Sequence, residues 1–276
     1  FEAATFEELY QGTRAVAWEE YIPENGRFWV AKVASVKSAL FSARDIQSVM
    51  KKAMVDRMSQ KYRREVFTED GDEYPLRVFL YKDMVTIGLD SSGTSLHKRG
   101  YRRLNNDAPI AENLAAGLIM LTPWKADRVL VDPFCGSGTF PIEAAMMAAR
   151  IAPGMNREFT AEKWVHLFPK KMWYDAGDEA SSMVTADIDT DIQGYDIDDK
   201  CVTISRENAR AAGVEHLIHF QRRDAADLSH PKKYGFIITN PPYGERMMND
   251  GGLQFVYKTL GERYAALDSW SMYLIT

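Results

Sequence analysis

The sequence predicts an α/β protein: an open, Rossmann-like parallel sheet, preceded by a smaller α+β domain. From residue 105 onward, short apolar runs of strand type alternate with helical patterns. Such alternation is typical of an open, mainly parallel sheet with helices on both faces. The residues before 103 instead mix helices with a β-hairpin. This change of pattern predicts two domains, 1–103 and 104–276.

The first domain is predicted to contain helices over 5–17 and 45–62, and strands over 28–33, 76–81 and 84–89. Thr5 followed by Glu8 is a capping-box signature for the start of a helix. The second helix places apolar side chains at helical spacing. Its opposite face is basic, through Lys51, Lys52, Arg57 and Lys61.

The second domain is predicted to contain helices over 108–121, 141–150, 198–212 and 255–267, and strands over 128–132, 192–197, 217–221, 234–239 and from 272 onward. Pro109 suits the first turn of a helix. In open parallel sheets, ligands bind beyond the carboxyl ends of the strands. Each motif described below follows such an end.

Composition limits the classes of protein to consider. The chain has 276 residues, 46% hydrophobic and 26% charged, with a net charge of −5. The first domain is slightly basic and the second acidic, which is weak support for non-specific nucleic-acid binding. No apolar run is long enough to span a bilayer, and the first residues do not resemble a secretion signal. Two distant cysteines indicate a reducing, cytoplasmic setting and no metal site.

The chain does not begin with Met, and Trp270 to Thr276 has the pattern of a strand that continues. We therefore expect a fragment, with a catalytic sheet that is incomplete at its C-terminus.

The run V-L-V-D-P-F-C-G-S-G-T, residues 129–139, is a strand that enters a glycine-rich turn and then a helix. Gly136 and Gly138 permit a tight turn and let a ligand approach the backbone. A phosphate-binding P-loop is excluded because no Gly-Lys-Ser/Thr follows the glycines. A dinucleotide-binding loop is less favoured because Pro141 stands where that loop needs a third glycine. Two interpretations remain: a loop that binds an adenosine-type cofactor such as S-adenosylmethionine, and a plain strand–helix turn without a ligand. Asp132 favours the cofactor, because a buried carboxylate needs a partner.

Acidic residues also follow the next two strands. Asp196 can accept both ribose hydroxyls, whereas Asp198 is better placed to cap the following helix. Asp224 can accept the adenine amine, with a helix cap as the alternative. The residues expected to contact the cofactor are Asp132, Pro133, Phe134, Gly136, Gly138, Thr139, Asp196, Ile197, Asp224 and Ala225.

The spacing from Gly136 to Asp196 is much longer than a dinucleotide fingerprint expects. The excess lies in 153–191, which carries the aromatic residues Trp164, Phe168, Trp173 and Tyr174. This segment is interpreted as an insertion beside the site, or as a surface excursion packed by its own aromatics.

Asn240-Pro241-Pro242-Tyr243 follow a buried strand, which must stop there because proline cannot donate to the ladder. An amine on a planar ring is a poor nucleophile. The Asn240 amide oxygen and the Pro241 carbonyl can accept its hydrogens, free its lone pair and stabilise the positive charge that develops on nitrogen. Pro242 helps to fix the backbone, and Tyr243 can stack on the planar group. The alternative is a proline-terminated strand with a packed tyrosine.

Further motifs accompany these two: S-L-H-K-R-G-Y-R (95–102), A-P-I-A-E-N-L-A-A (108–116), I-E-A-A (142–145), A-P-G-M-N-R-E-F (152–159) and N-P-P-Y-G-E-R (240–246). Together they resemble the THUMP-domain class I S-adenosylmethionine-dependent 23S rRNA (guanine-N2)-methyltransferases of bacteria. The resemblance covers nearly the whole chain. It implies an RNA-binding THUMP domain over residues 1–103, with at most the end of a ferredoxin-like segment before it. It also implies a seven-stranded catalytic sheet, of which this chain has about five strands.

The resemblance implies methylation of a guanine N2 amine in 23S rRNA or in a pre-ribosomal particle. Lys98, Arg99, Arg102 and Arg103 are compatible with phosphate contacts, although a solvated basic surface is the commoner explanation. The 153–191 insertion becomes a candidate for clasping a flipped base.

Three alternatives stay open. An N6-adenine-specific DNA methyltransferase and a protein glutamine N5-methyltransferase use the same amine chemistry. An RNA-binding protein that has lost activity is the third, and Asp132, Asp196, Asp224 and Asn240 argue against it. The sequence does not identify the target nucleotide or the oligomeric state.

Overall fold

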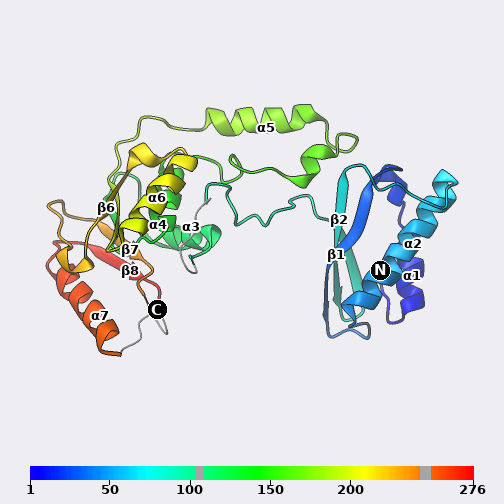
Figure 1. The fold of residues 1–276 in the computed structure, drawn as a ribbon, viewed down its shortest axis with the longest axis horizontal. Helices are drawn as coiled ribbons and strands as arrows, with labels where there is room; N and C mark the ends of the chain where they lie inside the picture. The colour runs from blue at the N-terminus through cyan, green and yellow to red at the C-terminus, as the bar shows by residue number, and fades with distance from the viewer. Residues whose placement is uncertain (103–108, 243–249) are drawn as a thin grey trace. The chain divides into compact units, whose positions relative to one another are not determined.

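The computed structural model describes residues 1–102, 109–242 and 250–276 (Figure 1). The chain forms two compact units. The first unit is Phe1–Thr94 with Glu158–Tyr174, and the second unit is Ser95–Arg157 with Asp175–Thr276. This division differs from the 103/104 boundary expected from the sequence, because a segment of the second half packs within the first unit.

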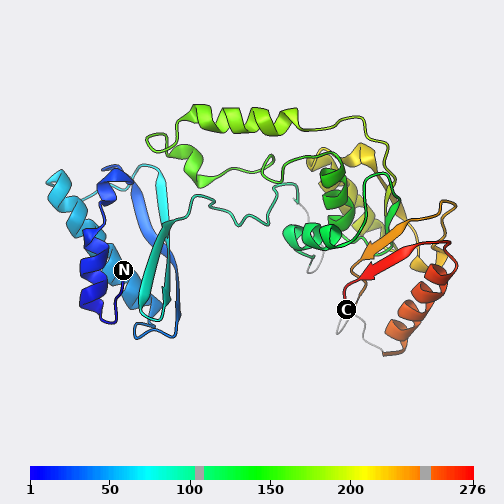
Figure 2. The same ribbon diagram turned by 180° about the vertical axis from the view of Figure 1, so that it is seen from behind.

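The first unit is a three-stranded sheet with two long helices. Its elements are α1 (Phe6–Ala15), the short helix η1 (Trp18–Glu20), β1 (Arg27–Val36), α2 (Ala43–Tyr62), β2 (Glu73–Tyr81) and β3 (Met84–Leu89). β1 pairs parallel with β2, and β2 pairs antiparallel with β3. Opposite views show α1 and α2 on the same side of this sheet (Figures 1 and 2).

Local signals place the two helices. The Thr5 hydroxyl accepts from the Glu8 amide at 3.2 Å, and the Glu8 carboxylate accepts from the Thr5 amide at 3.0 Å, so the capping box is confirmed. In α2, a buried stripe of Ile46, Met50, Ala53, Met54 and Met58 faces the core. The basic face is partly used inside the unit, since Lys51 pairs with Glu69 and Arg57 pairs with Glu19.

Glu158–Tyr174 belong to the first unit because Trp164 is part of its core. The indole is 2% exposed and stacks on Tyr74, with ring centroids 5.2 Å apart and an interplanar angle of 13°. Its Nε1–H donates to the Glu73 carbonyl at 2.8 Å. The Trp164 ring is therefore not available to clasp a flipped base, which corrects that expectation for the most buried aromatic of 153–191.

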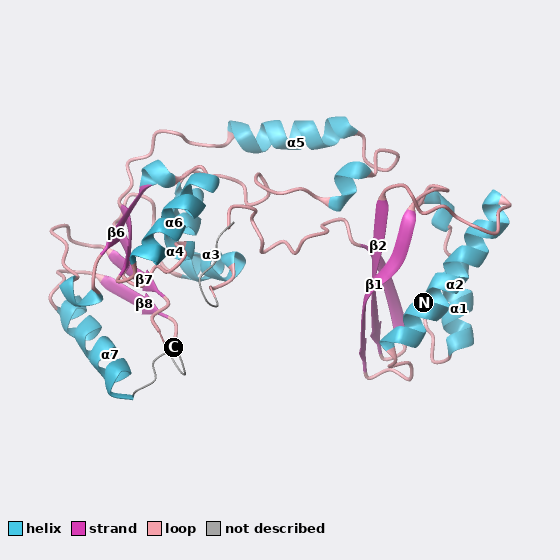
Figure 3. Ribbon diagram, viewed as in Figure 1, coloured by secondary structure: helices cyan, strands magenta, loops and turns pink. Residues whose placement is uncertain are grey.

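The second unit contains a five-stranded parallel sheet in the order β6-β5-β4-β7-β8 (Figure 3). The strands are β4 (Leu130–Asp132), β5 (Ile192–Asp196), β6 (Ile218–Arg222), β7 (Phe236–Thr239) and β8 (Ser271–Leu274). The helices are α3 (Glu112–Leu121), α4 (Thr139–Ala148), α6 (Asp199–Ala211) and α7 (Asp250–Ala265). Helix α5 (Lys170–Ser182) begins in the first unit and ends in the second, because the unit boundary falls after Tyr174. The predicted fold class is confirmed.

Alternate residues of the strands serve two cores. Leu130 packs in the cluster formed with α3, α4 and α6, whereas the adjacent Val131 packs in the cluster that holds Leu260 of α7. This is the pattern of a sheet buried on both faces. Helix α3 begins at Glu112 with Ala111 as its N-cap, so Pro109 precedes the helix instead of forming its first turn.

Chain direction determines where the motifs meet. The chain runs from β4 outward to β5 and β6, and then returns to β7 on the other side of β4. The β4–β7 boundary is thus a switch point, where the carboxyl ends of parallel strands leave a crevice for ligands. Within the described ranges, no helix combines the length and hydropathy that a membrane span requires.

We expect Trp164→Ala to lower the free energy of unfolding of the first unit by about 3–5 kcal/mol, because the change leaves a cavity beside Tyr74. Tyr174→Ala is the matched control, since Tyr174 is 69% exposed, and its effect should stay within about 0.5 kcal/mol. Urea denaturation followed by circular dichroism measures both. Equal stabilities of the two variants would show that this segment does not belong to the first core.

Candidate active site

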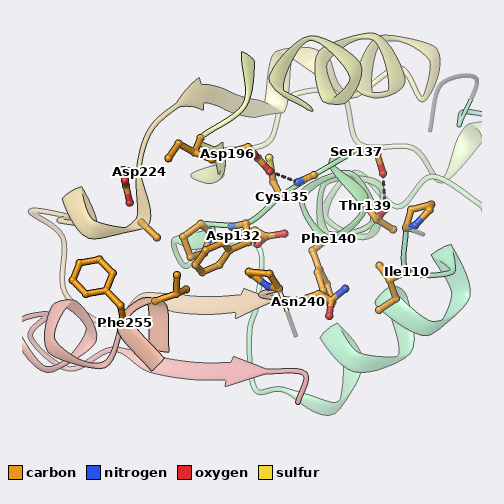
Figure 4. Close-up of a pocket in the computed structure, with 18 residues that line it drawn as sticks. Ile110, Asp132, Cys135, Ser137, Thr139, Phe140, Asp196, Asp224, Asn240 and Phe255 are labelled. Atoms are coloured by element: carbon orange, nitrogen blue, oxygen red, sulfur yellow. Dashed lines mark hydrogen bonds between the residues drawn. The ribbon is translucent and has the colours of Figure 1, made fainter. Parts of the chain in front are cut away.

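A pocket of about 460 Å³ opens at the carboxyl ends of β4, β5 and β7 (Figure 4). Its lining includes Asp132, Pro133, Phe134, Gly136, Thr139, Asp196, Ile197, Asp224, Ala225, Asn240 and Pro242. The structure thus brings together most of the residues selected from the sequence. Gly138 and Pro241 do not line the pocket, and Tyr243 and Arg103 lie outside the described residues.

The glycine loop joins β4 to α4. Gly136 and Gly138 both have positive φ, at 53° and 84°, a conformation that favours glycine. A Cβ on Gly138 would lie 2.8 Å from the Ser205 Cβ and 3.1 Å from the Phe220 ring. Gly138 therefore serves helix–sheet packing and not direct ligand contact, which revises its expected role.

Asp196, at the end of β5, is held by the backbone. Its two carboxylate oxygens accept from the Gly136 and Asp198 amides, each at 3.0 Å. Each oxygen keeps further acceptor capacity, so a pair of vicinal hydroxyls can still be bound. Burial raises the pKa of Asp196, which means that its charge is incompletely solvated and favours a donor from a ligand.

Asp132, at the end of β4, is 2% exposed. One of its oxygens accepts from the Thr239 hydroxyl at 2.6 Å and from the Phe134 amide at 3.1 Å. Burial raises the pKa of Asp132 to about 7, and these two hydrogen bonds oppose the shift only in part. The group therefore changes charge near neutral pH.

Asp224 follows β6, and its helix-capping role is confirmed. Its carboxylate accepts from the Ala226 amide at 2.8 Å and caps the short helix η4 (Ala225–Asp227). The same side chain lines the pocket together with the exposed Ile197. A flat apolar ring can lie against Ile197 with its polar edge toward Asp224.

Asn240 follows β7 and lies toward the centre of the pocket with Asp132 (Figure 4). Its Oδ1 is buried and accepts no hydrogen bond within the described part of the chain. A buried acceptor without a donor is costly and uncommon. The amide oxygen is thus suited to receive a hydrogen from a bound molecule.

Two arginines that were expected to contact RNA are instead built into the second unit. The Arg102 guanidinium donates to Thr139 Oγ1 and to the Ile110 carbonyl, both at 2.8 Å, and its side chain is 11% exposed. Arg99 lies 3.6 Å from the Glu143 carboxylate, with 12% of its side chain exposed. Little surface of either remains for phosphate. Lys98 is exposed.

The structure adds lining residues that the sequence did not indicate. Ile110 precedes α3, Phe140 belongs to α4, and Phe255 and Val256 belong to α7. They are ordinary apolar residues of helices, and only long-range packing brings them to the pocket. No group of three metal-ligating side chains occurs among the residues the structure describes.

Comparisons with known proteins agree with this geometry. Residues 99–276 match the family model described as the RMKL-like methyltransferase domain, and residues 3–90 match the THUMP domain. A Bacillus subtilis (strain 168) protein named "Putative RNA methyltransferase YpsC" is 44% identical over 278 residues, which cover 100% of this chain and 72% of that protein.

Ribosomal RNA large subunit methyltransferase K/L of Shewanella woodyi is 37% identical over 277 residues, covering 96% of this chain and 38% of that protein. A crystal structure of SMU.472 complexed with SAH is 42% identical, with a TM-score of 0.92, and the match covers 99% of this chain and 72% of that one. The chain therefore spans part of the length of each of these proteins.

The raised pKa of Asp132 predicts a pH-dependent stability. Because the unfolded carboxyl titrates near 3.8 and the folded one near 7, this group's stabilising contribution is fully present below about pH 4 and is lost as the pH rises to 7. The free energy of unfolding should fall with a slope approaching about 1.4 kcal/mol per pH unit in that window. Asp132→Asn keeps the acceptor oxygen and should lack this component. Identical pH profiles from urea denaturation would contradict the assignment.

Proposed function

The chain belongs to the RMKL-like methyltransferase family, and we propose that it uses S-adenosylmethionine to methylate the exocyclic N2 amine of a guanine in 23S rRNA. The observation that carries this proposal is the buried Asn240 Oδ1, which has no partner among the described residues and lies beside a loop suited to an adenosine-type cofactor. The relatives named as RNA and rRNA methyltransferases support an RNA substrate, and so does the THUMP domain. A ribosomal substrate is consistent with the cytoplasmic setting expected from the cysteines.

The pocket residues fit the cofactor. Asp196, held by two backbone amides, would bind the ribose hydroxyls, and Asp224 with Ile197 would bind the adenine. The Gly136 turn lets the ligand approach the main chain. The cofactor supplies an electrophilic methyl group on a sulfonium. The chain's own task is to present an amine in line with that methyl group.

Asn240 and Pro241 act on the acceptor. Hydrogen bonds from the amine to the Asn240 amide oxygen and the Pro241 carbonyl would turn its lone pair toward the methyl group. The same oxygens would stabilise the positive charge that nitrogen gains during transfer. Pro242 lines the pocket, and Tyr243 is proposed to stack on the base. No metal or strong base is required by this chemistry.

The choice of guanine N2 depends on the resemblance of the motifs over 95–246 to rRNA guanine-N2 methyltransferases. The Asn240 geometry supports an exocyclic amine of either purine. An N6-adenine DNA methyltransferase therefore remains the rival, and mass spectrometry of rRNA nucleosides from a deletion strain separates the two.

In the full-length protein, Asn240→Ala should lower methyl transfer to unmodified 23S rRNA by about 10²-fold or more, because it removes an acceptor that acts in the transition state. Cofactor affinity, measured by calorimetry, should largely survive. Asn240→Asp keeps an acceptor oxygen and should lose less. Methyl transfer to duplex DNA and not to rRNA would overturn the substrate assignment.

Asp196→Ala should weaken binding of S-adenosylmethionine by about tenfold or more, since hydrogen bonds to a charged acceptor are lost. Asp199→Ala is the matched control, because the Asp199 side chain is 71% exposed and does not line the pocket. Isothermal titration calorimetry compares the two. Unchanged affinity in Asp196→Ala would show that a residue other than Asp196 binds the ribose.

A further inference from the structure

Within the first unit, all of whose residues the structure describes, one face of the three-stranded sheet has no helix packed on it (Figures 2 and 3). Alternate residues of the strands point to this side, opposite the core residues Val78, Leu80 and Val85. We call the part of this side where all three strands pair the open sheet face. It consists of Lys32, Ala34, Val36, Arg77, Phe79, Tyr81, Met84, Thr86 and Gly88.

Strand register arranges these residues in three rows. Val36 pairs with Tyr81, which pairs with Met84, and Ala34 pairs with Phe79, which pairs with Thr86. The third row is Lys32, Arg77 and Gly88. Neighbouring strands lie about 4.8 Å apart and successive rows about 7 Å apart. Two apolar or aromatic rows therefore lie beside one basic row.

The aromatic rows are exposed to solvent. Phe79 is 46% and Tyr81 43% exposed, and Met84 and Val36 beside them are 51% and 44% exposed. The Phe79 and Tyr81 rings are nearly parallel, with an interplanar angle of 5° and centroids 6.3 Å apart. A contiguous exposed patch of this kind marks a binding surface more often than a chance exposure does.

Positive charge flanks the rings on both sides. Lys32 and Arg77 form the row beside Phe79, and the Lys82 ammonium lies 5.5 Å from the Tyr81 ring centroid. Lys37 directly follows β1 and is exposed. Three acids lie nearby: Asp90 pairs with Arg77 at 2.7 Å, the half-buried Asp83 accepts from the Ala39 amide at 2.7 Å, and the exposed Glu2 bridges to Met84 at the edge of the sheet. The lysines leave the patch net positive.

Other cations in the chain are less suited to this task. On α2, Lys51 and Arg57 pair with Glu69 and Glu19. Arg99 and Arg102 are enclosed with Glu143 and Glu112 in the second unit. The open sheet face combines exposed parallel rings with flanking lysines in one place.

We propose that the open sheet face binds a single-stranded segment of the RNA substrate. Bases stack on Phe79 and Tyr81, and phosphates lie near Lys32 and Lys82. Aromatic rings on an open sheet with cations beside them are a general way to hold unpaired nucleotides, because every base has a π-face. The proposal depends on the proposed RNA substrate and identifies which part of the chain binds it.

The occupant is single-stranded because a duplex keeps its bases stacked on one another and offers the rings only its backbone. An RNA strand satisfies the lysines and the rings together. A protein partner that covered Phe79 and Tyr81 would need acidic groups opposite Lys32, Lys37 and Lys82 as well.

The test measures binding of a fluorescein-labelled, mixed-sequence 12-nucleotide RNA to the whole chain by fluorescence anisotropy, without cofactor. Phe79→Ala combined with Tyr81→Ala should weaken binding at least tenfold. Phe6→Ala combined with Tyr21→Ala is the matched control and should stay within twofold. Phe6 and Tyr21 are 40% and 42% exposed and lie outside the strands of the sheet.

Two further variants separate stacking from charge and from misfolding. Tyr81→Phe keeps the ring and should keep the affinity, whereas Tyr81→Leu keeps apolar area and should lose affinity. Lys32→Ala combined with Lys82→Ala should reduce the slope of log affinity against log salt by about 1.4, as expected for two phosphate contacts on a single strand.

Unchanged RNA affinity in the Phe79/Tyr81 double variant, or equal affinity for a duplex of the same length, overturns the proposal. A change of oligomeric state without a change in RNA affinity also overturns it, in favour of a protein-binding face. The assay contains no methyl donor, so the RNA affinities test the open sheet face even if the proposed methyl transfer is not observed.

Discussion

The Thr239 hydroxyl donates to the Asp132 carboxyl at 2.6 Å and joins the ends of β7 and β4, 107 residues apart in the chain. β4 leads into the loop proposed to hold the methyl donor, and β7 leads into the residues proposed to hold the acceptor. The parallel pairing of these two strands brings the two halves of the site together. If β7 paired elsewhere, Asn240 would lie away from the glycine loop.

This juxtaposition places several polar groups in one pocket. Asp132, Asp196 and Asp224 all line it, and the negative charge of Asp196 adds to the burial that raises the pKa of Asp132. The buried Asn240 Oδ1 is a further acceptor, and no donor reaches it from residues 1–102, 109–242 or 250–276. The burial of Asp132 and of the Asn240 oxygen costs stability in the free protein. A cofactor that carries a sulfonium and an ammonium, together with an amine acceptor, complements them. The energetic cost of these buried groups and the choice of the proposed ligands thus have one explanation.

The connectivity of the two units has a separate physical basis. The chain passes between them after Thr94, Arg157 and Tyr174. Trp164 anchors the returning segment in the first core, and Arg102 anchors the start of the second unit by bonds to Thr139 and Ile110. Residues that lie in a connecting stretch of the sequence therefore belong to the cores of the units they join.

The sequence by itself determined the strand–helix order, the glycine turn, the acidic strand ends and the N-P-P-Y stop, because each depends on neighbouring residues and on the rule that parallel strands end at one edge. Only the tertiary structure decided which side chains are enclosed. It placed Arg99 and Arg102 in ion pairs, gave Gly138 a packing role, and added Ile110 and Phe255 to the pocket. It also moved Trp164 into the first core and left Phe79 and Tyr81 outside it. Burial depends on partners distant in sequence, and no local pattern of charge or hydrophobicity specifies them.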